Sequence, residues 1–358
     1  MGAATGTSQR PGTLVFSLAG TALSLTVDRP AVSAYAADRL RGLAVDTRSE
    51  PSIASLLVVQ GARQALRRLR ETVPSAGASR RMSLDVDRLF APQIAPLSGL
   101  TLAWGRDGAA ITQTTVLADG LGAQYVKRLA RRLSADFFVD QLVQFGGLFP
   151  LLYAAEQHGW APLHAALVDT PHGAVLIAGG AGAGKSTLAV GLSTRLGNRL
   201  LADNLALTDG AGALGVPEPV KLDSWSARAV GETAAVAARG GGDAGWGRRE
   251  YEPPAASGPV KPALIVLPRL AGAAAIDAVE PARAASALAA GAMLAFEIQT
   301  YYRYAAAVAS ADSMAPPPRR DGCVSRLAAD NPVVALAVVR GQPLTASLDL
   351  IERRLERR

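Results

Sequence analysis

Eight consecutive residues near the middle of the chain have the pattern of a phosphate-binding loop. They fit G-x-x-x-x-G-K-[ST] and are Gly179, Gly180, Ala181, Gly182, Ala183, Gly184, Lys185 and Ser186. Glycines let successive backbone N–H groups converge on phosphate oxygens, and the N-terminus of a following helix adds the positive end of its dipole. We therefore expect Lys185 to bridge the β and γ phosphates of a nucleotide, and the Ser186 hydroxyl to coordinate Mg²⁺.

The sequence on either side of this loop predicts the secondary structure that the motif requires. The apolar run 174–178 predicts a strand, and helical sequence begins at Thr187, which we include among the nucleotide-binding residues. The glycines do not have the G-x-G-x-x-G spacing of a dinucleotide-binding turn. The alternative interpretation is a glycine-rich turn that binds nothing.

Asp203 is the candidate acid of this site, although it follows Lys185 by only 18 residues. A helix of about ten residues leads about 15 Å away from the loop, and a strand of about five residues returns over the same distance. We therefore expect Asp203 to lie beside the nucleotide phosphates. The alternative is that Asp203 caps the turn after the strand.

The three histidines of the chain all lie shortly before the strand that leads to the loop. His158 and His172 are each followed by glycine in a predicted turn, and we interpret them as structural. His164 instead begins a strand-like segment that we expect to lie beside the strand at 174–178. This position makes His164 a candidate site residue.

Together, His164-Ala165, residues 179–187 and Ala202-Asp203 resemble the HPr kinase/phosphorylase superfamily. The closer likeness is to HPr-kinase-related proteins associated with peptide modification, and it covers about residues 148–270. The resemblance implies an α/β fold: a P-loop kinase domain of HPr kinase/phosphoenolpyruvate carboxykinase type with an N-terminal α+β domain. It further implies that Lys185 and Ser186 hold ATP and Mg²⁺, that Asp203 activates the acceptor hydroxyl and shares the metal, and that His164 lies near the transferring phosphate.

The chain departs from this family at three positions. Asn204 stands where the family has a second aspartate, which removes an anionic metal ligand. Ala181 replaces the usual loop serine, and Thr187 replaces the glutamate of HPr kinases proper. Their C-terminal signature is also not visible, so HPr itself is not the expected substrate.

The resemblance implies an ATP-dependent kinase that phosphorylates a hydroxyl, Ser or Thr, of a small protein or ribosomal precursor peptide. Two alternatives stay open. One is a nucleotide-binding scaffold with little phosphotransfer, which Asn204 and Ala181 motivate. The other is a small-molecule kinase acting on a sugar or an amino acid. Lys221 and Arg248-Arg249 are candidate contacts to phosphates or to an acidic substrate, with ordinary surface charge as an equal alternative.

We expect two domains to position these residues: an N-terminal α+β recognition domain, 1–147, and a P-loop domain, 148–358, with a C-terminal helical and strand extension. For the first domain the patterns predict two hairpins, one pairing 14–18 with 23–27 and the other pairing 100–104 with 109–116. They also predict helices at 54–73, 124–133 and 136–145. For the second they predict a buried helix at 151–160, strands at 263–267 and 333–339, and helical sequence at 281–308 and 348–358. The Gly/Pro-rich segment 236–259 is expected to be a loop and a candidate lid.

The composition excludes several classes of protein. Of 358 residues, 49% are hydrophobic and 19% are charged, which is typical of a globular protein rather than a disordered one. The formal net charge of +7 does not predict nucleic-acid binding, because no stretch combines clustered basic residues with interleaved aromatics. A single cysteine, Cys323, excludes an internal disulfide, and no Cys/His group has zinc spacing.

No apolar run reaches the roughly 18 residues of a membrane helix. We therefore expect a cytoplasmic protein that binds neither membranes nor nucleic acid. The sequence leaves open whether the chain forms a homo-oligomer.

Overall fold

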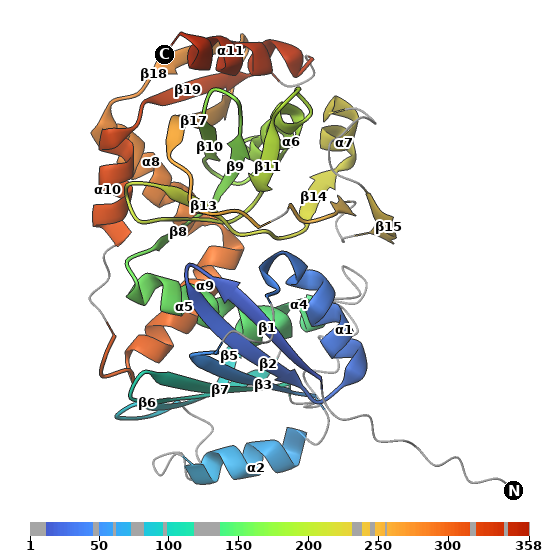
Figure 1. Cartoon of the computed structure of the whole chain (residues 1–358), viewed down its shortest axis with the longest axis vertical. Coiled ribbons are helices and arrows are strands. Elements are labelled where there is room, and N and C mark those ends of the chain that lie inside the picture. Colours follow the sequence, from blue (N-terminus) through green and yellow to red (C-terminus); the bar gives the residue numbers. More distant parts are fainter. Residues whose placement is uncertain are drawn as a thin grey trace, which may run out of the picture.

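The computed structural model is a mixed α/β protein in which two sheet-containing parts are stacked along the long axis, with helices between them (Figure 1). It describes residues 12–45, 50–59, 62–72, 82–95, 99–117, 137–230, 238–243, 248–254, 256–315, 320–339 and 343–357. The predicted α/β class is confirmed. The helical sequence predicted at 124–133 lies outside the described residues.

The N-terminal part, within the described residues, contains one seven-stranded sheet in the order β1-β2-β3-β7-β6-β5-β4. Its strands are β1 (Thr13–Leu18), β2 (Thr21–Val27), β3 (Ile53–Val58), β4 (Ser83–Asp85), β5 (Arg88–Ala95), β6 (Leu100–Asp107) and β7 (Ala110–Leu117). The antiparallel pairs β1–β2 and β6–β7 confirm both predicted hairpins. Helix α1 (Pro30–Arg39) and a short 3₁₀ turn (Arg41–Leu43) follow β2.

The prediction of one helix over 54–73 is wrong for its first half. Residues Ile53–Val58 form strand β3, which lies inside the sheet and pairs in parallel with both β2 and β7. Ile53, Ser55 and Leu57 are buried, whereas Ala54 and Leu56 are exposed, which is the period of two expected for a strand. Helix α2 begins only at Ala62 and ends at Thr72.

A layer of helices covers one face of this sheet. Helix α4 (Phe137–Val143), a π-helical turn (Gln144–Leu148) and α5 (Phe149–Gln157) follow one another without interruption. The described part of the helix predicted at 136–145 is thus helical. The buried helix predicted around Leu151 is confirmed, although it ends before Trp160.

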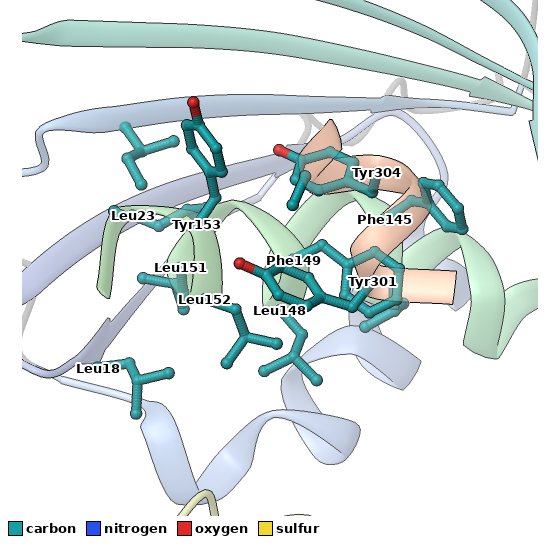
Figure 2. Packing of buried hydrophobic residues seen from close by; sticks show 14 of the residues in the cluster. Leu18, Leu23, Phe145, Leu148, Phe149, Leu151, Leu152, Tyr153, Tyr301 and Tyr304 are labelled. Atoms are coloured by element: carbon teal, nitrogen blue, oxygen red, sulfur yellow. The ribbon is translucent and has the colours of Figure 1, made fainter. Parts of the chain in front are cut away.

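Helix α9 (Phe296–Ala309) completes the hydrophobic core of the N-terminal sheet from far along the chain. Figure 2 shows Tyr301 and Tyr304 of α9 beside Phe149, and the ring centroids of Phe149 and Tyr301 are 5.6 Å apart. The Tyr304 hydroxyl donates to the buried Gln113 side chain of β7 at 2.6 Å. The boundary at 147/148 therefore stays a prediction: the helical run crosses it, and the N-terminal core uses residues from both sides.

The second part is built around a sheet that is six-stranded within the described residues, with the order β11-β9-β10-β17-β19-β18. Its strands are β9 (Ala165–Asp169), β10 (Ala174–Ala178), β11 (Arg199–Ala202), β17 (Pro262–Leu270), β18 (Ala275–Ala278) and β19 (Val333–Val338). Strands β10, β17 and β19 are parallel, while β9 is antiparallel to β10 and β11. The strands predicted at 174–178, 263–267 and 333–339 are confirmed.

Helices cover both faces of this mixed sheet, whose central strands β10, β17 and β19 are parallel. One hydrophobic cluster joins α6 (Lys185–Ser193) and α11 (Thr345–Glu356) to one face, and another joins α8 (Pro281–Leu294) and α10 (Arg320–Asp330) to the other. The C-terminal helix is confirmed. The helical sequence predicted at 281–308 forms two helices, α8 and α9, because the backbone is extended at Ala295. No helix among the described residues is long and apolar enough to span a membrane.

Two small antiparallel sheets flank this core in the described chain. One contains β8 (Ala161–Leu163), β12 (Ala206–Thr208) and β13 (Ala213–Gly215), and the other contains β14 (Val220–Asp223), β15 (Ala238–Asp243) and β16 (Arg248–Tyr251). Helix α7 (Ser224–Val230) follows β14. The predicted loop at 236–259 is therefore wrong in part, because β15 and β16 lie within it and β16 pairs with β14. Residues 236, 237, 244–247 and 255 lie outside the described residues.

Candidate functional site

The phosphate-loop motif connects the C-terminal end of β10 directly to the N-terminus of α6. Gly182 and Gly184 have φ angles of 75° and 92°, a region in which a side chain would be strained. Gly184 is the N-cap residue of α6, so the free N–H groups of the first helical turn lie next to the loop. The strand, loop and helix occur in the order that the motif requires.

Helix α8 packs against the first glycine of the loop. A Cβ atom added at Gly291 would lie 3.3 Å from the backbone carbon and oxygen of Gly179. This is tighter than ordinary van der Waals contact, and backbone atoms cannot rotate away. Gly291 carries no local sequence signal of this role, because it is one of many small residues in an alanine-rich helix.

Lys185 is the first residue of α6 and is only 6% exposed. Its ammonium group donates a hydrogen bond to the carbonyl oxygen of Gly180 at 3.0 Å, so the side chain folds back over the loop. Burial lowers the pKa of Lys185 to about 8, against the opposing charges of Asp203 and Glu297. The Lys185 ammonium is thus a buried cation that contacts the backbone of the loop.

Asp203 follows the last residue of β11 and is 5% exposed. Burial raises its pKa to about 6, although a hydrogen bond with the Ser186 side chain and the positive charge of Lys185 act in the opposite direction. Its Oδ1 atom is buried and has no hydrogen-bond partner among the described residues. A buried acceptor without a donor is costly and needs a ligand or a cation to satisfy it.

This donor set fits a magnesium ion. The Ser186 hydroxyl and the Asp203 carboxylate are oxygen ligands of the kind that Mg²⁺ prefers, and Mg²⁺ commonly binds through one or two protein groups together with substrate phosphates. Among the described residues there is no group of three or more His, Cys, Asp or Glu side chains that holds a metal by itself. A cation here would depend on a phosphate-bearing ligand.

His164 lies between β8 and β9, and β9 pairs with the loop strand β10 as predicted. Its Nδ1 atom lies 3.1 Å from the backbone carbonyl oxygen of Asn204. A carbonyl oxygen only accepts, so Nδ1 carries the proton and Nε2 has a lone pair. Burial, with the nearby charge of Lys185, lowers the pKa of His164 to about 4. The imidazole is therefore neutral at pH 7.

The Asn204 side chain contacts an acid that the sequence did not reveal. Its Nδ2 atom donates to Oε2 of Glu218 at 3.5 Å. Burial raises the pKa of Glu218, while the charges of Arg39 and Lys221 oppose the rise. Glu218 stands between two prolines in a segment with no motif, and only the fold brings it to this position.

A buried ionic cluster connects the N-terminal part of the chain to this site. The guanidinium of Arg39, at the end of α1, lies 2.8 Å from Asp140 of α4 and 2.7 Å from Glu250 of β16. Strand β16 also carries Arg248, whose charge opposes the rise that burial causes in the pKa of Asp203. Strand β16 thus carries both Glu250, which pairs with the N-terminal part of the chain, and Arg248, whose charge acts on Asp203.

A cavity of about 330 Å³ lies at the loop. Its lining combines the loop, basic side chains and an apolar wall, from Gly182 to Leu188 with Lys221, Asp223, Trp225, Ser226, Arg248, Leu270, Val338 and Leu344. Of the basic residues considered from the sequence, Lys221 and Arg248 line this cavity. Arg249 is not among its described lining residues.

Another cavity, of about 340 Å³, lies between α5, α9 and α10. Trp160, Tyr302 and Arg320 are among its lining residues, and the Arg320 guanidinium lies 3.5 Å from the centre of the Tyr302 ring. None of the candidate site residues lines it. Lys185, Ser186 and Thr187 line the loop cavity, whereas Asp203 and His164 are not among its described lining residues.

Comparison with known proteins adds no further constraint. No protein-family model matches the chain, and no curated protein matches it. The arrangement itself brings Lys185, Ser186 and Asp203 together, with His164 close enough for the charge of Lys185 to affect it. It also adds Glu218, Glu297 and Trp225, which sequence inspection did not single out.

Proposed function

We propose that this protein is an ATP-dependent kinase that transfers the γ-phosphoryl group to a Ser or Thr hydroxyl of a small protein or precursor peptide. The observation that carries the proposal is the buried Asp203 carboxyl, with an oxygen that lacks a partner among the described residues, beside Ser186 and Lys185 at a glycine-rich loop. Phosphoryl transfer depends mainly on positioning and on electrostatic stabilisation, and these groups suit both tasks.

The proposal includes the fold type. A loop that follows β10 and an acid that returns on β11 after one short helix resemble the nucleotide site of the HPr kinase/phosphoenolpyruvate carboxykinase type. His164, before the strand next to β10, is the third element of that resemblance.

In this proposal Lys185, Ser186, Asp203 and His164 have different roles in phosphoryl transfer. The ammonium of Lys185 leaves the Gly180 carbonyl and binds the β and γ phosphates. Ser186 and Asp203 would hold Mg²⁺, which would supply positive charge to neutralise the phosphates. Asp203 accepts the proton of the acceptor hydroxyl, because its buried carboxyl lies beside Ser186 and has an oxygen that lacks a partner among the described residues. Neutral His164 accepts a hydrogen bond at Nε2 without adding positive charge.

The test is phosphoryl transfer from γ-labelled ATP by the purified full-length protein. A degenerate library of Ser- and Thr-containing peptides is one acceptor pool, and a panel of sugars and amino acids is the other. Label in peptides that disappears in folded Lys185→Ala supports the proposal. Label only in small molecules supports a small-molecule kinase instead, and unchanged transfer by Lys185→Ala removes the loop from the mechanism.

One observation favours a second candidate function, a nucleotide-binding scaffold. The residue after Asp203 offers an amide that bonds to Glu218, and so it does not supply a second anionic metal ligand. Tight binding of Mg²⁺-ATP, measured by calorimetry, with no transfer to either pool would establish the scaffold.

A further inference from the structure

The loop cavity continues away from the phosphate loop into an apolar region. Beyond Lys221 and Arg248, its lining passes to Trp225 of α7, Val338 at the end of β19 and Leu344 just before α11. These same three residues also line a small adjoining cavity. Trp225, Val338 and Leu344 therefore form the boundary between the loop cavity and the space beside the start of α11.

Helix α7 holds Trp225 in a defined position relative to the loop. The Ser226 backbone N–H donates to Oδ1 of Asp223 at 2.7 Å, which caps the start of the helix. The hydroxyls of Thr187 and Ser226 form a buried hydrogen bond of 2.8 Å between α6 and α7, which lie side by side in Figure 1. Thr187 is two residues after Lys185, so the position of Trp225 is tied to the helix that begins at the loop.

The cavity thus has two chemically different regions. Around the loop are backbone N–H groups and the cationic side chains of Lys185, Lys221 and Arg248. Around Trp225 the wall is apolar, and it includes Leu270, which is 57% exposed despite being a large aliphatic residue. An exposed leucine and a half-buried indole next to an anion site match a ligand with a polyphosphate at one end and a flat apolar group at the other.

We propose that Trp225 is the platform on which the purine base of the nucleotide stacks, with Leu270, Val338 and Leu344 as the facing wall. This inference rests on the proposed function, because it assumes that a nucleoside triphosphate occupies the phosphate loop. Aromatic stacking is tolerant of base identity because every base has a π-face.

The two polar side chains next to Trp225 in this segment, Asp223 and Ser226, are already engaged. Asp223 accepts from the α7 backbone, and Ser226 is bonded to Thr187. The site is therefore expected to bind a purine by its face and not to distinguish its edge. ATP and GTP should bind with affinities within about fivefold of each other.

The experiment measures dissociation constants by titration calorimetry on the full-length protein, with Mg²⁺-ATP, Mg²⁺-GTP and Mg²⁺-tripolyphosphate. Trp225→Ala should weaken both nucleotides by about 10- to 100-fold, the range expected for loss of one stacked base. Its affinity for tripolyphosphate should be unchanged, because that ligand has no base. Trp225→Phe keeps an aromatic face and should retain most of the nucleotide affinity. Trp160→Phe, which alters the other cavity, is the matched control and should behave as the wild type.

The outcomes separate this inference from the proposed function. If tripolyphosphate and ATP bind but Trp225→Ala has no effect on ATP, the stacking platform is refuted and the phosphate site stands. Equal weakening of tripolyphosphate and ATP also refutes it, because Trp225 would then act only through the shape of the loop. If wild-type protein binds none of the three ligands, the proposed function and the platform fail together. If Trp225→Ala does not fold, Trp225→Leu keeps the test decisive: it retains apolar bulk without an aromatic face, so it should weaken both nucleotides and leave tripolyphosphate unchanged, and unchanged ATP affinity would refute the platform.

Discussion

Replacing Asp203 by asparagine should make the metal-free protein more stable at neutral pH. The carboxyl is buried, and its pKa is about 6 rather than 3.8. A tenfold change in an equilibrium constant is worth about 1.4 kcal/mol, so ionising Asp203 in the folded chain costs about 3 kcal/mol. Asparagine has nearly the same shape and carries no charge. Asp203→Asn should therefore exceed the wild type by about 3 kcal/mol in the free energy of unfolding above pH 7.

The sign follows from proton binding. Below pH 3.8 both states of the wild type hold the Asp203 proton, and the stability associated with its raised pKa is fully present. Between 3.8 and about 6 only the folded state keeps the proton, so the wild type loses stability as pH rises through this window. The difference between variant and wild type should be roughly half as large at pH 5 as above pH 7, where it reaches about 3 kcal/mol.

Urea denaturation with EDTA at several pH values between 5 and 8 measures this difference, with the slope of the transition checked for constancy. Equal or lower stability of Asp203→Asn throughout the range would refute the reasoning, because it would mean that the carboxylate is already satisfied. The second readout is turnover, which should fall by about two to four orders of magnitude while nucleotide affinity changes little. Equal losses in affinity and rate would make Asp203 chiefly a metal ligand.

Three further substitutions test the neighbouring groups. Lys185→Ala should fold, as judged by circular dichroism, and should abolish transfer and weaken ATP binding, because it removes the charge that meets the β and γ phosphates; normal phosphotransfer would contradict this. Asn204→Asp should leave turnover unchanged or lower it, since it places a carboxylate about 3.5 Å from Glu218; a marked gain in an Mg²⁺ titration would show instead that a lost metal ligand had been restored. Gly291→Ala should weaken tripolyphosphate binding by about tenfold through displacement of the Gly179 backbone, which its Cβ would approach to 3.3 Å; calorimetry checks this, and Ala292→Gly, in the same helix, is the comparison for helix stability.

The sequence by itself determined those features that depend on neighbouring residues. A strand, a glycine-rich loop and a following helix are predicted by local pattern, because an apolar run and a cluster of glycines are properties of a few adjacent positions. The helix begins at Lys185, two residues before the predicted start at Thr187. The return of Asp203 to the loop also follows, since helix rise and strand rise nearly cancel over so short a distance. The hairpins β1–β2 and β6–β7 were predictable for the same reason, as both partners lie close together in the sequence.

The tertiary structure decided what depends on residues far apart in the chain. The sequence did not separate strand β3 from the basic helix α2 that follows it. The place of β3 between β2 and β7 is set by pairing with strands in other parts of the chain. Glu218 meets Asn204, Trp225 reaches the phosphate loop and α9 completes the N-terminal core only because separate segments pack together. Burial is also decided by the tertiary structure. The raised pKa of Asp203 and the lowered pKa values of Lys185 and His164 arise mainly from the exclusion of water, which cannot be inferred from the spacing of residues in the sequence.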